Sequence, residues 1–145
     1  MAGPNIDPIV SRVGDLSTNG TTGMSQFLLT ADNDYTGIGA NAVLVFTADA
    51  TNGGYVQRLR FKAAGTNTAS VARIFINNGL SPGTATNNCF YGEVSLPATT
   101  GIATSATVEI DYPMEFALPA GFRIYFNLGT TVAAGWNCVA IGGKY

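Results

Sequence analysis

The chain has 145 residues, which suits one domain with a single core. Hydrophobic residues make up 46% and charged residues only 11%, against about 25% charged in an ordinary globular protein, so part of the surface is expected to be buried against a partner. The net charge of −2 argues against binding to nucleic acid, and no apolar run approaches the roughly 18 residues of a membrane span.

Residues 1–24 differ in composition from the rest of the chain. They are rich in proline, glycine, serine, threonine and asparagine and show no sustained period, which predicts an extended N-terminal arm. They lack a basic segment followed by an apolar core, so no secretory signal is expected and assembly would take place in the cytosol. The apolar residues of this arm that could dock onto another protein are Ile6, Ile9, Val10, Val13 and Leu16.

Residues 25–145 are predicted to form a single all-β domain. Eight runs have strand character, and the residues between them are typical of turns, as in Asp32-Asn33-Asp34 and Asn77-Asn78-Gly79. No stretch keeps a helical period for three turns, so an eight-stranded antiparallel β-sandwich is expected. The runs are 25–31, 40–48, 55–63, 69–77, 88–96, 106–118, 121–129 and 135–143.

Alternation of apolar and charged residues indicates how two of these strands pair. In 55–63, the basic residues alternate with Leu59 and Phe61, and in 106–118, the acidic residues alternate with a long apolar series. A jelly roll would place these third and sixth strands side by side with opposite charges facing each other, which favours that topology. Pro113 predicts a kink or a sheet edge. The charged residues are Arg58, Arg60, Lys62, Glu109, Asp111 and Glu115.

The other four long runs (40–48, 121–129, 69–77 and 88–96) would form a second sheet. Its outer face would combine aromatic residues with arginine, a mixture typical of protein–protein interfaces. We expect it to be either a subunit interface or a solvated face. The candidate interface residues are Val71, Arg73, Phe75, Tyr91, Arg123 and Tyr125.

The sequence offers little basis for catalysis, and the chain is not expected to be an enzyme. It contains no histidine, which excludes serine–histidine and cysteine–histidine arrangements. A carboxylate pair could still support glycoside hydrolysis. However, the candidate carboxylates Glu93, Glu109, Asp111 and Glu115 fall on outward strand positions, where ion pairing is the simpler reading.

Three further features are better explained by a structural role than by ligand binding. Asp32-Asn33-Asp34 could ligate Ca²⁺, but no glutamate closes such a loop, so an Asx turn is favoured. Cys89 and Cys138 lack metal-ligand spacing and are expected in the core. Trp136 shares the parity of Cys138, so a core position is favoured over a sugar-stacking one. No metal and no cofactor is expected.

Several segments of the second half resemble the capsid decoration, or cement, proteins of tailed bacteriophages. These segments are 73–79, 86–88, 91–99, 117–121, 128–136 and 141–143. The resemblance implies a jelly-roll subunit that trimerises on the outer surface of the virion capsid and binds the major capsid protein. It implies no catalytic residue, and the arm would be the part that contacts the capsid.

Two other functions remain open. A phage head or tail fibre, or a receptor- or carbohydrate-binding module, would require aromatic residues grouped at loop tips, such as Tyr35, Tyr55 and Trp136. An enzyme would depend on the acidic residues alone.

Overall fold

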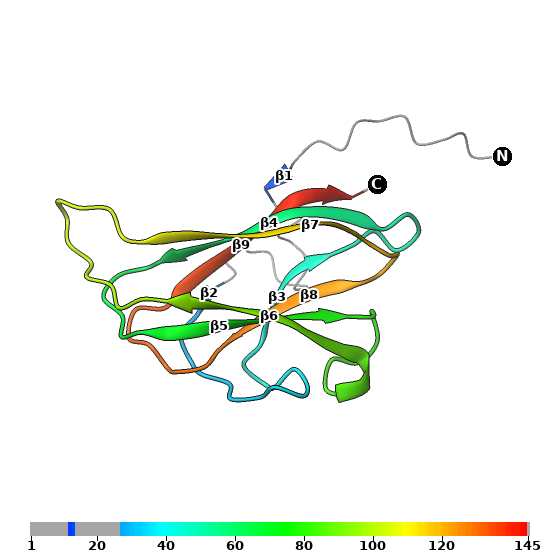
Figure 1. Cartoon of the computed structure of the whole chain (residues 1–145), viewed down its shortest axis with the longest axis horizontal. Helices are drawn as coiled ribbons and strands as arrows, with labels where there is room; N and C mark the ends of the chain where they lie inside the picture. Colours follow the sequence, from blue (N-terminus) through cyan, green and yellow to red (C-terminus); the bar gives the residue numbers. More distant parts are fainter. Residues whose placement is uncertain (1–11, 14–26, 145) are drawn as a thin grey trace.

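The computed structural model describes residues 12–13 and 27–144, which form two antiparallel sheets packed face to face (Figure 1). The first sheet has the order β1-β9-β4-β7, and β2 pairs with β9 as well. The second sheet has the order β3-β8-β5-β6. The first sheet consists of β1 (Arg12–Val13), β2 (Phe27–Leu28), β9 (Trp136–Lys144), β4 (Gly54–Ala63) and β7 (Glu109–Leu118). The second consists of β3 (Val43–Thr47), β8 (Arg123–Leu128), β5 (Ser70–Asn77) and β6 (Asn88–Leu96).

The all-β, two-sheet architecture confirms the sequence prediction, and seven of the eight expected runs coincide with long strands. The exception is the run at 25–31, of which only β2 is a strand, and β1 adds a further short strand within the expected arm. The structure describes Arg12–Val13 alone from residues 1–24, so Ile6, Ile9, Val10 and Leu16 lie outside the described residues. The helical structure in the described part of the chain includes no segment long and apolar enough to cross a membrane.

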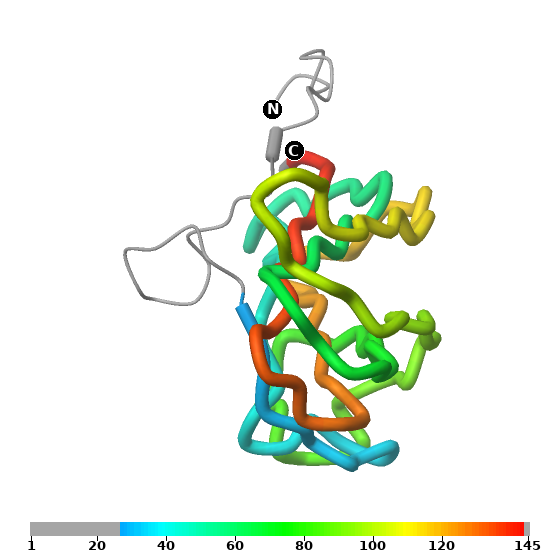
Figure 2. The backbone as a smooth tube through the Cα atoms, turned by 90° about the vertical axis from the view of Figure 1, so that its left-hand side faces the viewer, coloured from blue at the N-terminus to red at the C-terminus, as the bar shows by residue number. Residues whose placement is uncertain are grey.

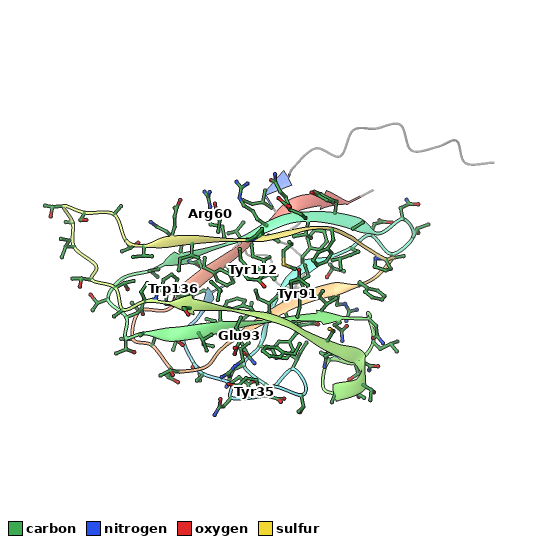
Figure 3. The ribbon with its side chains drawn as sticks, viewed as in Figure 1. Tyr35, Arg60, Tyr91, Glu93, Tyr112 and Trp136 are labelled. Carbon is green, nitrogen blue, oxygen red and sulfur yellow. The ribbon has the colours of Figure 1, made fainter. Side chains whose placement is uncertain are left out.

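The core lies between the two sheets, and in β4 alternate side chains point into it. Leu59 and Phe61 of β4 point inward and are fully buried, as the alternation predicts. Trp136 at the start of β9 is also fully buried, which confirms its predicted core position (Figure 3). Phe61 meets Phe126 of the second sheet edge to face, with ring centroids 5.7 Å apart.

The outer face of the second sheet is covered over part of β5 and β8, which corrects the prediction of an open face there. Residues 31–42, here called the strap, run beneath this sheet before the chain enters β3 (Figure 2). Ile38 of the strap packs on Phe75 and Tyr125 in a second, smaller apolar cluster. Alternation identifies which side chains point outward, but it cannot reveal that another part of the same chain covers them.

Candidate interaction surface

The outer face of the first sheet carries a ladder of ion pairs between β4 and β7. In the strand register, Arg60 lies opposite Asp111 and Lys62 opposite Glu109. The Arg60 guanidinium donates two hydrogen bonds to Asp111, at 2.8 Å and 3.2 Å. Arg58 approaches Asp111 at 3.6 Å, and Lys62 approaches Glu109 at 3.9 Å. The charge pairing expected between the third and sixth runs is therefore confirmed.

These pairs neutralise one another on a solvated face. The hydrogen bond from Arg60 lowers the pKa of Asp111, and the same bond raises the pKa of Arg60. Exposed pairs of this kind contribute little to stability, so the ladder mainly fixes how β4 and β7 align. β7 is an edge strand, as Pro113 predicted, and its charged side chains discourage further strand pairing.

The acidic residues proposed for catalysis are separated rather than gathered. Glu109 and Asp111 form part of the ladder on the first sheet, whereas Glu93 pairs with Arg73 on the outer face of the second. Within residues 12–13 and 27–144, no group of three or more His, Cys, Asp or Glu residues could hold a metal ion. The Asx turn is confirmed, because the Asp34 carboxylate accepts hydrogen bonds from the Thr36 and Gly37 amides. The Thr36 amide is the main cause of the lowered pKa of Asp34.

Arg73 anchors the strap and is not available to another subunit. Its side chain donates to Glu93 at 3.1 Å, to the Asp32 carbonyl at 3.3 Å and to the Tyr35 hydroxyl. The guanidinium also lies 3.9 Å from the centroid of the Tyr35 ring, within cation–π range. These contacts leave Arg73 only 4% exposed. A buried arginine needs such partners, and the strap supplies most of them.

The six candidate interface residues therefore fall into different environments. Arg73, Phe75 and Tyr125 are buried beneath the strap, so the expectation that they lie on an open face was wrong. Val71 and Arg123 are half-buried.

Tyr91 is exposed, but its side chain turns toward β7 and does not lie on the outer face of the second sheet, as was predicted. The β5–β6 register shifts between Ile74 and Phe75, and this bulge breaks the alternation in β6. Tyr91 consequently contacts Tyr112 and Phe116 of β7 and closes the edge between the two sheets (Figure 3). Burial raises the pKa of Tyr112, and the neighbouring Tyr91 adds to the effect.

The three described connections at one end of the sandwich contain no charged residue. Three connections meet there: 64–69 between β4 and β5, 97–108 between β6 and β7, and 129–135 between β8 and β9 (Figure 1). None of these residues is Asp, Glu, Lys or Arg. We call these three connections the loop end. Lys62 lies at its base, where it donates a hydrogen bond to the Thr107 carbonyl at 2.6 Å.

Asn67 ties the three connections of the loop end together. Its side-chain oxygen accepts hydrogen bonds from the Ala134 and Gly135 amides, both at 2.8 Å. Its side-chain nitrogen donates to the Gly135 carbonyl at 3.1 Å, and its backbone pairs with that of Thr99. The Thr99 hydroxyl in turn donates to the Gly65 carbonyl at 2.6 Å. Asn67 is 3% exposed, so the loop end is held in place by buried polar contacts.

The β6–β7 connection extends outward from the sandwich at this end (Figure 1). Residues 100–106 are all exposed, and a bridge between Ile102 and Ser105 closes the tip into a turn. The Ile102 side chain is 54% exposed. The loop end therefore combines an anchored base with an uncharged projection that exposes Ile102 at its tip, features that suit contact with another protein.

Sequence reasoning did not select the loop end. The absence of charge in 97–108 and 129–135 was visible, but only the fold shows that these segments and 64–69 meet at one end. The aromatic residues proposed for sugar binding do not form a group: Tyr35 is on the strap, Tyr55 is in β4, and Trp136 is in the core. Cys138 is buried as expected, whereas Cys89 is exposed, so its predicted core position was wrong.

Comparisons with protein-family models, with curated proteins and with solved structures found no match for this chain.

Proposed function

We propose that this chain is a structural subunit of a phage virion, which decorates the capsid and stabilises it by binding the major capsid protein as an oligomer, a trimer. The loop end is the observation that carries the proposal. An uncharged surface with an exposed apolar tip, held by buried hydrogen bonds, favours protein–protein contact over catalysis or binding of a charged ligand.

The strand pairing supports the jelly roll that we propose for this subunit. Pairing is nested along the chain, with β5 next to β6, β4 next to β7, β3 next to β8, and β2 next to β9. A long antiparallel ribbon that is folded once and then rolled into two sheets gives this nesting, and such double-sheet rolls are common in viral capsid proteins. The fold alone does not identify the function, because one fold serves many functions, and the surface has to supply the evidence.

Co-sedimentation with capsids tests the proposal. The purified chain would be mixed at micromolar concentration with expanded capsids that lack it, from the phage whose genome encodes it. We expect saturable binding at a fixed number of copies per capsid, and a solution mass of three chains. A folded chain that stays in the supernatant at every concentration would contradict the capsid role.

The arm provides a second test of the same proposal. Removing residues 2–20 should leave a folded oligomer that no longer binds capsids, if the apolar residues of the arm make the capsid contact. Retained binding would show that the arm does not make the capsid contact, which would then have to lie on the sandwich.

A further inference from the structure

We infer that β6 accepts a strand from another protein, so that an extended segment of this partner continues the second sheet. The segment that fits carries apolar side chains on one face and, on the other face, a basic side chain opposite Glu93. The inference goes beyond the proposed function and does not require the partner to be a capsid protein.

The main chain of β6 defines what can bind to it. β5 pairs with one side of β6, and no described strand pairs with the other side. An edge strand presents a row of main-chain donors and acceptors on its outer side. Another extended main chain matches such a row, so the partner is a polypeptide that adds a strand to the sheet.

The other edges of the two described sheets are short or protected. β7 carries Pro113 and the ion-pair ladder, and β3 has five residues with a register shift. β1 and β2 have two residues each. β6 is nine residues long, lacks proline, lysine and arginine, and pairs regularly with β5 over Gly92–Leu96. Among these edges, β6 is therefore the one open to strand addition.

Exposed aromatic rings lie on both sides of β6. Phe90 is 40% exposed and meets Tyr35 of the strap, with ring centroids 5.6 Å apart. Tyr91 is also 40% exposed, and its ring lies 5.3 Å from that of Phe116 in β7 (Figure 3). An added strand would cover apolar surface on either side of its main chain, which adds side-chain contacts to the main-chain hydrogen bonds.

Alternation along Gly92–Leu96 indicates which side chains of the partner would be apolar. Val94 packs against the core, and a Cβ on Gly92 would meet the Tyr112 hydroxyl, so both residues face the first sheet. Partner residues opposite Gly92 and Val94 would face the same way, because cross-strand neighbours share a face. Apolar side chains fit there, beside the ring of Tyr91.

Glu93 indicates the charge of the partner and argues against a second copy of this chain. It is the one charged residue of β6 and pairs with Arg73 on its β5 side at 3.1 Å, yet 41% of its side chain is exposed. Its outer side can pair with a second cation. Antiparallel pairing of β6 with itself about Gly92, Glu93 or Val94 would place Glu93 opposite or diagonal to its own copy, where like charges destabilise the pair.

A synthetic peptide with the sequence of β5, residues 70–77, is a suitable probe. β5 already pairs with β6, places Arg73 opposite Glu93, and carries Ala72 and Ile74 on the face that points to the core. The peptide would be added, up to about 1 mM, to the full-length protein, and amide hydrogen exchange would be followed residue by residue by NMR. We expect slower exchange in β6, because its outward amides gain acceptors. A peptide with Arg73→Glu should bind at least about five-fold more weakly.

Lysine substitutions on two edge strands provide the matched comparison. Ser95 in β6 and Ala117 in β7 are both exposed. Ser95→Lys should weaken binding of the peptide by at least about ten-fold, because lysine on an edge discourages pairing, while Ala117→Lys should change it by less than about two-fold. Near-ultraviolet circular dichroism would verify that both variants are folded.

Four results would overturn the inference. They are unchanged exchange in β6 at the highest peptide concentration, equal binding of the Arg73→Glu peptide, equal effects of Ser95→Lys and Ala117→Lys, and association of wild-type chains that Ser95→Lys alone abolishes. The last result would identify a second copy as the occupant of β6. No capsid enters this experiment, so its failure leaves the capsid role in place, and a chain that binds the peptide but no capsid would overturn only the capsid role.

Discussion

Replacing Asn67 with alanine should loosen the entire loop end, because one side chain joins its connections. The substitution removes the oxygen that accepts hydrogen bonds from the Ala134 and Gly135 amides at 2.8 Å. It also removes the nitrogen that donates to the Gly135 carbonyl at 3.1 Å and to the Thr99 hydroxyl at 3.3 Å. Alanine can replace none of these bonds.

The expected cost follows from the groups left without partners. A buried donor that loses its hydrogen bond costs about 1–3 kcal/mol, and Asn67→Ala leaves two backbone amides in this position. Because the Gly135 amide is buried and the Ala134 amide is part-buried, we expect the free energy of unfolding to fall by roughly 2–4 kcal/mol, a large part of the about 5–15 kcal/mol that stabilises a typical domain. The melting temperature should fall by roughly 10 °C.

Urea unfolding followed by tryptophan fluorescence measures this effect directly. Trp136 is the one tryptophan in the sequence and is fully buried, so its emission reports the core that adjoins the loop end. Asn52→Ala is a suitable control, because Asn52 is exposed in the turn between β3 and β4. We expect the control to stay within about 0.5 kcal/mol of the wild type. If Asn67→Ala lowers the free energy of unfolding no more than the control does, the hydrogen bonds of Asn67 do not stabilise the loop end.

Three further predictions follow from other parts of the structure. Asp111→Asn should flatten the dependence of stability on pH, because the hydrogen bond from Arg60 lowers the pKa of Asp111 in the folded protein. The stabilisation by this carboxylate is fully present above about pH 4, the pKa of an unfolded aspartate. It is lost as the pH falls through the lower pKa of the folded state. In the native protein, a thiol reagent should modify Cys89, which is exposed, and spare Cys138, because burial raises the pKa of that thiol well above its usual value. Arg73→Met should lower the free energy of unfolding by about 1–2 kcal/mol and release the strap, because it removes the hydrogen bonds to the strap while the Glu93 and Tyr35 side chains left behind can be solvated.

Each of these predictions has a clear contrary outcome. Urea midpoints measured between about pH 2 and pH 7 would be parallel for the wild type and Asp111→Asn if the ladder had no effect. Modification of two thiols per native chain at one rate would show that Cys138 is accessible. Hydrogen exchange in the strap that is unchanged by Arg73→Met would mean that other contacts hold the strap in place.

Local pattern in the sequence was sufficient to predict most of the strands. Alternation placed Leu59 and Phe61 inside and Arg60 outside, because side chains on a strand point to opposite faces in turn. The pairing of β4 with β7 was expected for a jelly roll and favoured by the opposite charges of the two runs, and the register brings Arg60 and Asp111 together.

The prediction failed where a residue's neighbours come from distant parts of the chain. Phe75 and Tyr125 point outward as expected, but they are buried because Ile38 lies over them. Tyr91 was misplaced because a bulge in β6, which alternation cannot anticipate, turned it toward β7. Cys89 was expected in the core, yet it lies in an edge strand and is exposed.

The sequence by itself determined that the chain is all-β, where its strands lie, and how few charges it has, because these depend on residue type and local period. Only the tertiary structure decided that the strap covers one sheet and that three uncharged connections join around Asn67 at one end. The physical reason is that burial and surface composition depend on which distant segments meet, and hydrogen bonds between segments that lie about 70 residues apart leave no local periodic trace in the sequence.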